Sequence, residues 1–158
     1  MLGLGFKISE KTIEETINSK SELKTYEIEG ERYHPENSVF KIPYKITNSK
    51  IESMKLDSAS ASLIINLKET TSDGILEISI PRNLIDSIIS NGQDDEFFIL
   101  INGEETKFTE PSKSPCFRNL LIEFPETTNE IEIIASFIYS YPISKVPDEC
   151  IDKTIVKS

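Results

Sequence analysis

Residues 73–86 read DGILEISIPRNLID, a turn, an alternating segment and a proline in direct succession. Leu76, Ile78 and Ile80 share one face of an extended chain, and the polar residues between them point the other way. Alternation of this kind is typical of a half-buried β-strand, and Pro81 predicts where the strand ends. The stretch therefore predicts a framework of strands for the chain.

The same alternation recurs between turn residues from about Tyr26 to Ile138, which favours an all-β sandwich over a parallel α/β sheet. Asn102-Gly103 predicts a tight hairpin, and Gly74 closes a loop as a residue able to take positive φ. Pro43 predicts an edge strand or a bulge. Further strands are expected over residues 40–46, 54–57, 63–67, 97–101, 104–109, 120–124 and 131–137.

Two segments have helical spacing. Residues 82–90 place apolar side chains one turn apart ahead of Asn91-Gly92, so a short helix is predicted there. Between residues 9 and 19 an amphipathic helix competes with an extended strand. We expect an N-terminal extension over 1–30, which is a short helix or a donated strand, a sandwich domain over 31–140 and a tail over 141–158.

Charge limits the partners of the chain. It has 158 residues with 17 basic and 27 acidic side chains, a net charge of −10 that disfavours nucleic acid and anionic membrane surfaces. No apolar stretch is long enough to span a bilayer, so membrane insertion is not expected. The first residues lack the basic flank and apolar length of a signal peptide, so the sequence leaves the localisation open.

Few residues offer catalytic or metal chemistry. His34 is the only histidine, and a surface-loop position is the favoured interpretation because no activating elbow or helix terminus lies near it. Cys116 and Cys150 could form one disulfide or remain free thiols, and Arg118 could lower the pKa of the Cys116 thiol. Two cysteines and one histidine are too few for a structural zinc site. No catalytic residue and no cofactor are predicted.

Acidic side chains flank the predicted hairpin on both sides and could offer oxygen ligands to calcium. They match neither an EF-hand loop nor a Gly-Asp-rich repeat, so a solvated surface is the favoured interpretation. The candidate calcium residues are Asp94, Asp95, Glu96, Glu104 and Glu105.

The middle of the chain, roughly residues 40 to 135, resembles the β-sandwich domain of uncharacterised, often surface or secreted, proteins of ammonia-oxidising archaea. The matching pieces are Ile42-Pro43-Tyr44 with Ile46, Met54 with Leu56-Asp57, Ser62 to Ile65, the 73–86 stretch, Asp95 to Glu105, Cys116 with Arg118, Leu120, Ile122 to Pro125, and Glu130 to Ile134. The resemblance implies an immunoglobulin-like or fibronectin-like domain with an adhesion, envelope-assembly or other binding role. It implies an extracellular or cell-surface location, no catalytic residues and no cofactor.

The leading hypothesis is a non-enzymatic interaction or structural module with a protein partner, or a homo-oligomer. Its binding surface would be a sheet edge, to which residues 1–30 of a neighbour could donate a strand. The alternative is a calcium-binding or carbohydrate-binding domain that uses the acidic hairpin, with Tyr139 and Tyr141 as exposed aromatic candidates. A hydrolase that uses Cys116 or a carboxylate pair is the third hypothesis.

Overall fold

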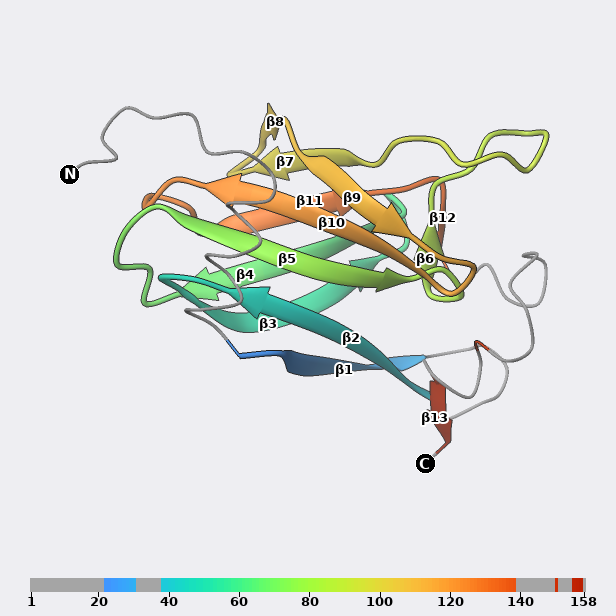
Figure 1. Cartoon of the computed structure of the whole chain (residues 1–158), viewed down its shortest axis with the longest axis horizontal. Coiled ribbons are helices and arrows are strands. Elements are labelled where there is room, and N and C mark those ends of the chain that lie inside the picture. The colour runs from blue at the N-terminus through green and yellow to red at the C-terminus, as the bar shows by residue number, and fades with distance from the viewer. Residues whose placement is uncertain (1–21, 31–37, 139–149, 151–154, 158) are drawn as a thin grey trace.

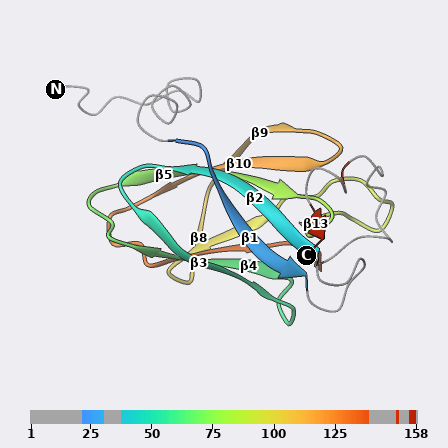
Figure 2. The ribbon, with the colours of Figure 1, turned by 90° about the horizontal axis from the view of Figure 1, so that it is seen from below.

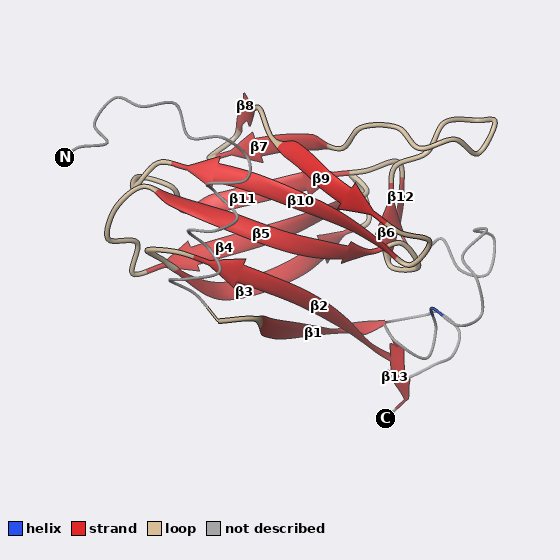
Figure 3. Ribbon diagram, viewed as in Figure 1, coloured by secondary structure: helices blue, strands red, loops and turns tan. Residues whose placement is uncertain are grey.

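The computed structural model of the chain describes residues 22–30, 38–138, 150 and 155–157. Every element of two or more residues in that part is a β-strand, and Cys150 alone has helical backbone (Figures 1 and 3). The strands are β1 (Lys24–Gly30), β2 (Ser38–Ile46), β3 (Lys50–Asp57), β4 (Ser62–Lys68), β5 (Gly74–Pro81), β6 (Ile85–Asp86), β7 (Phe98–Ile101), β8 (Glu104–Thr106), β9 (Thr109–Lys113), β10 (Phe117–Phe124), β11 (Glu130–Ile134), β12 (Phe137–Ile138) and β13 (Ile155–Lys157).

These strands form two antiparallel sheets that face each other (Figures 1 and 2). Sheet A has the order β1-β2-β5-β10-β9, with β13 also paired to β2, and sheet B has the order β3-β4-β11-β7-β8. The short pair β12-β6 lies near one end of the sandwich (Figure 1). The predicted all-β sandwich is confirmed.

The 73–86 stretch supplies β5, a central strand of sheet A. Leu76, Ile78 and Ile80 are fully buried, and β5 pairs with β2 on one side and β10 on the other. Its strand ends at Pro81, as predicted. Since both neighbours are backbone-paired and one face is apolar, the register of β5 is fixed by the core.

Gly74 is needed for a different reason from the predicted one. Positive φ occurs at Gly92 and Gly103 but not at Gly74. A Cβ on Gly74 would instead collide with the Thr47 carbonyl oxygen and the Phe124 ring. The glycine therefore allows close approach of sheet neighbours, and the expectation of a left-handed turn residue was wrong.

The Asn102-Gly103 hairpin between β7 and β8 is confirmed. Asn102 and Gly103 have φ of 50° and 85°, and two consecutive positive φ values are those of a type I′ turn. The Asn102 side chain also fastens this turn to the next loop, because its Oδ1 accepts hydrogen bonds from the backbone N–H groups of Asn129 (2.8 Å) and Glu130 (3.0 Å).

Pro43 lies in an inner strand whose register shows no shift, so neither the predicted edge position nor the alternative bulge is found. β1 pairs with β2 along its whole length, while on the other side β5 pairs with Tyr44–Ile46 and β13 with residues 38–40. Residues alternate their N–H direction along a strand, and Thr47 donates toward β5. The position where Pro43 lacks an N–H therefore lies on the β5 and β13 side of β2, between the residues that pair with β13 and those that pair with β5. No described strand accepts a hydrogen bond there.

The predicted helix over 82–90 is also wrong. The chain instead makes a turn after Pro81, the two-residue strand β6 and an isolated bridge between Ile88 and Asp94. The N–H of Ile88 binds Ser136 Oγ at 2.8 Å, a partner outside the segment. A nine-residue helix is marginal by itself, and tertiary hydrogen bonds compete for its backbone. The alternative helix at 9–19 lies outside the described residues.

Candidate functional site

Arg118 on β10 is the centre of a charge cluster inside one end of the sandwich. Its side chain is only 2% exposed. Nε and Nη2 donate to the two oxygens of Glu110 (2.8 and 2.9 Å), Nη1 donates to Asp86 Oδ1 (3.1 Å) and the Ser87 carbonyl (2.8 Å), and Nη2 donates to the Asp95 carbonyl (2.8 Å). All five guanidinium N–H groups of Arg118 are thereby used.

Arg118 stays charged in this position. Burial alone lowers its pKa, but the hydrogen bonds and negative charges of Glu110 and Asp86 more than offset burial, so the pKa of Arg118 is raised. The guanidinium also stacks on Phe97, 4.6 Å from the ring centroid, a cation–π contact. The buried charge is therefore both neutralised and covered.

Arg82 forms a second layer of the cluster nearer to solvent. Its Nη1 and Nη2 donate to the two Asp94 oxygens at 2.7 and 3.0 Å, and Nη1 also lies 3.3 Å from Asp86 Oδ2. Lys113 Nζ approaches Asp94 at 3.0 Å. The hydrogen bond from Arg82 is the main cause that lowers the pKa of Asp94 well below its usual range, and Lys113 adds to the effect.

The cluster balances three cations with three carboxylates, and Asp86 bridges the two arginines. Each carboxylate is held by a cation, so none of them is a free general base, and Arg82 and Arg118 have no spare role as anion receptors. The arrangement joins β9 and β10 to the 82–97 loop. Arg82 and Asp86 pair across the turn that follows β5.

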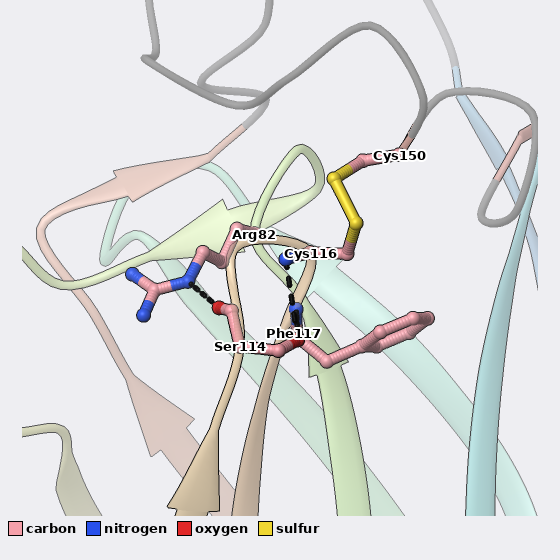
Figure 4. The surroundings of a disulfide bond; sticks show 5 residues. All are labelled: Arg82, Ser114, Cys116, Phe117 and Cys150. Atoms are coloured by element: carbon pink, nitrogen blue, oxygen red, sulfur yellow. Dashed lines mark hydrogen bonds between the residues drawn. A yellow bond between two sulfur atoms is a disulfide. The ribbon is translucent and has the colours of Figure 1, made fainter.

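A disulfide lies beside Arg82 (Figure 4). Cys116 in the turn between β9 and β10 is bonded to Cys150, with their Cα atoms 5.2 Å apart. Ser114 Oγ accepts hydrogen bonds from the backbone N–H groups of Cys116 (3.3 Å) and Phe117 (3.1 Å). The backbone N–H of Arg82 donates to the Cys116 carbonyl at 2.9 Å. With both sulfurs bonded, neither cysteine is a thiolate nucleophile in this structure. Arg118, which was expected to act on the Cys116 thiol, binds Glu110 and Asp86 instead.

The acidic calcium candidates are placed in two regions. Asp94 is bound by Arg82 and Lys113, and Asp95 Oδ1 accepts the N–H of Glu96 at 2.8 Å. Glu104 and Glu105 lie exposed on β8. In the part of the chain that the structure describes, no group of three or more His, Cys, Asp or Glu side chains could hold a metal ion. Calcium binding stays a prediction.

Three aromatic or imidazole candidates, His34, Tyr139 and Tyr141, lie outside the described residues. Tyr26 and Tyr44 are half-buried and pack against the core. Burial and the neighbouring Tyr26 raise the pKa of Tyr44.

The outer surface of sheet B carries a set of apolar side chains that no described element covers, and sequence reasoning missed it. Leu63, Ile65, Ile99, Ile131 and Ile133 fill the core, so the alternate residues on the same strands face outward. The outward residues are Ser62, Ile64 and Asn66 on β4, Phe98 and Leu100 on β7, and Glu130, Glu132 and Ile134 on β11. The four apolar ones together with Glu132 are called here the sheet B face.

Register brings the members of the sheet B face side by side. Ile134 is directly opposite Phe98, while Glu132 lies between Ile64 and Leu100. Phe98 is 44% exposed and the other three apolar side chains are half-buried. The sequence did carry a signal for this face. The residues between the core positions of a solvated strand are usually polar, but here Ile64, Phe98, Leu100 and Ile134 are apolar.

The sheet edges are protected against pairing with another chain. β9 carries Pro111, β8 is three residues long with two glutamates, and β3 has an irregular register between Ile51 and Ser53. β1, the other edge strand of sheet A, carries three charged side chains, Lys24, Glu27 and Glu29. Short strands, charges, proline and bulges are devices that prevent edge-to-edge association.

The chain matches no family model, no curated protein and no solved structure. Over the described residues, no helix has the length and apolar character that crossing a bilayer requires.

Proposed function

We propose that this chain is a non-enzymatic β-sandwich module, of the immunoglobulin-like or fibronectin-like kind, that binds other proteins in assembly or cell-envelope adhesion. The observation that carries the proposal is the sheet B face, where Phe98 and three further apolar side chains lie together without a covering element among the described residues. Uncovered apolar patches on a protein surface mark interaction sites.

Two other features support a binding role. The charged side chains best placed for chemistry, Arg82 and Arg118 with their carboxylates, neutralise one another inside the fold. The disulfide between Cys116 and Cys150 suits an oxidising compartment, in agreement with the surface or secreted location that the archaeal resemblance implies.

The proposal places binding on a face instead of an edge. β1, which belongs to the segment considered for strand donation, pairs with β2 of its own chain over all seven residues. The remaining edges carry the protective features described above. A partner therefore gains more from apolar contact with the sheet B face than from backbone pairing at an edge.

Selection from a displayed library of random peptides on the immobilised full chain tests the proposal. Peptides enriched by the wild-type protein are expected to lose binding to Phe98→Asp. They should keep binding to Leu23→Asp, a matched change at an apolar residue that is 66% exposed beside β1 of sheet A. No enrichment, or equal loss with both variants, would refute the proposed function.

A further inference from the structure

Glu132 is a carboxylate set in the middle of the apolar sheet B face. Its direct cross-strand neighbours are Ile64 on one side and Leu100 on the other, and its own strand continues to Ile134. Oε2 accepts a hydrogen bond from Ser62 Oγ at 2.7 Å and a longer one from Ser60 Oγ at 3.4 Å. A half-buried carboxylate held in place by a serine is a defined anchor point for a partner.

The second oxygen of Glu132 has no such contact. Among the described residues no hydrogen bond reaches Oε1, and none of the ion pairs includes Glu132. A charge surrounded by apolar side chains gains from a cation that approaches from outside, since the pair is less screened there than in open solvent. The chemistry of this site therefore favours an ammonium or a guanidinium group.

Around the face two further carboxylates outnumber one lysine, which favours a cationic partner. Across the sheet, the row through Glu132 ends in Lys55 at one side and Glu105 at the other, and the neighbouring row on β11 adds Glu130. With a net charge of −10, the whole chain attracts positive partners at long range.

We infer that the sheet B face binds an extended segment of a partner protein in which a lysine or arginine lies between apolar side chains. The cation pairs with Glu132, and apolar side chains two residues away contact Phe98, Leu100 and Ile134. Side chains on one face of an extended segment repeat every second residue, a spacing of about 7 Å that matches the spacing along β7 and β11. The inference rests on the proposed function and names its partner.

A second copy of this chain fits the face less well. If two copies packed face to face about a two-fold axis running along β11, the Glu132 carboxylates of both copies would meet across the axis. Like charges brought together on an apolar surface are destabilising. A partner with the opposite charge avoids this cost.

Calorimetric titration of the full chain with three synthetic peptides tests the inference. The probe repeats valine-serine-lysine-serine over about ten residues, which places valine and lysine alternately on one face of an extended chain, and its two counterparts replace all lysines by glutamate or all valines by serine. Binding is expected for the valine-lysine peptide, with at least about tenfold weaker binding for each counterpart. Equal binding of the serine-lysine peptide would overturn the need for the apolar face.

Two isosteric variants separate the site from general charge attraction. Glu132→Gln keeps an oxygen for Ser62, and Glu123→Gln removes one charge from an exposed position on the outer side of sheet A. We expect about tenfold weaker peptide binding with Glu132→Gln and less than about twofold weakening with Glu123→Gln. Equal weakening with both variants would overturn the inference.

The outcomes distinguish the inference from the proposed function. If the library yields ligands that need Phe98 but do not need Glu132, the cationic partner is wrong and the interaction module stands. If sedimentation shows a dimer of the chain that Phe98→Asp abolishes, the occupant is a second copy and the inference fails. If the library yields no ligand at all, the proposed function fails.

Discussion

Arg118→Met is expected to lower the free energy of unfolding by about 4 kcal/mol. Breaking a buried ion pair by removing one partner costs about 3–5 kcal/mol, and each buried carbonyl left without a donor adds about 1–3 kcal/mol. Arg118 holds two carboxylates and the carbonyls of Ser87 and Asp95, so the loss would exceed about 5 kcal/mol, the top of the ion-pair range, if nothing relaxed.

Two features bring the expected loss back to the middle of that range. Asp86 has two hydrogen bonds that do not depend on Arg118, from the Ser87 N–H (2.8 Å) and from Arg82 (3.3 Å). Both are expected to remain after the substitution. The Glu110 side chain is 19% exposed and can recover hydration. Methionine is unbranched and fills most of the arginine stem volume against Phe97, so the apolar packing changes little.

Urea unfolding followed by circular dichroism measures the loss, because the chain has no tryptophan for fluorescence. The midpoint of thermal unfolding should fall by about 8–16 °C for a domain of this size. Lys113→Met is the matched control, since it also removes one cation from the cluster but its side chain is 54% exposed. That variant should cost no more than about 1 kcal/mol.

An equal, small loss of stability in Arg118→Met and Lys113→Met would refute the stabilising role of the buried Arg118 ion pairs. Arg118→Lys adds a second check, since lysine keeps the charge but cannot supply five donors in a fixed plane. It should fall between the wild type and methionine.

Three further results are expected. Replacing both Cys116 and Cys150 by alanine should lower stability by about 4 kcal/mol in chemical unfolding, because the 34-residue separation sets the loop entropy of the unfolded chain; a loss below about 1 kcal/mol would contradict this. Gly74→Ala should cost about 2 kcal/mol through overpacking, and a neutral effect would show that the strands can separate. The lowered pKa of Asp94 contributes stability above its unfolded pKa of 3.8, and this contribution should be lost as the pH falls below about 4. Arg82→Met should flatten that acid limb, and an unchanged pH profile would exclude the pairing as its cause.

Local patterns in the sequence predicted most of the strands. The alternation in residues 73–86 and the Asn102-Gly103 pair each express a local rule, period-2 burial or a turn with positive φ, that the sandwich preserves. The segment 82–90 shows where such rules stop. Its apolar residues have helical spacing, yet Leu84 and Ile85 are fully buried while Ile89 is 43% exposed. The backbone of this segment forms no helix because its N–H groups bind other partners, for example Ile89 N–H the Gln93 carbonyl.

The candidate sites were less accessible from the sequence. Asp94 was grouped with its acidic neighbours as an oxygen donor, but its oxygens bind Arg82 and Lys113. Asp94 is far in the sequence from Arg82 and Lys113, so no local pattern predicted these ion pairs, which depend on which strands are adjacent. Glu132 and Phe98 belong to different strands, β11 and β7, and only the strand order brings them onto one face.

Sequence patterns alone indicate that this chain builds strands, where most of them turn, and that its surface is strongly acidic, because these properties depend on neighbouring residues and on composition. Only the folded structure establishes which strands pair, that Cys116 meets Cys150, that Arg118 is neutralised inside the fold, and that no described element covers the apolar face with Glu132 at its centre. These properties join residues far apart in the chain, and their contacts follow from sheet order and packing, which no local pattern encodes.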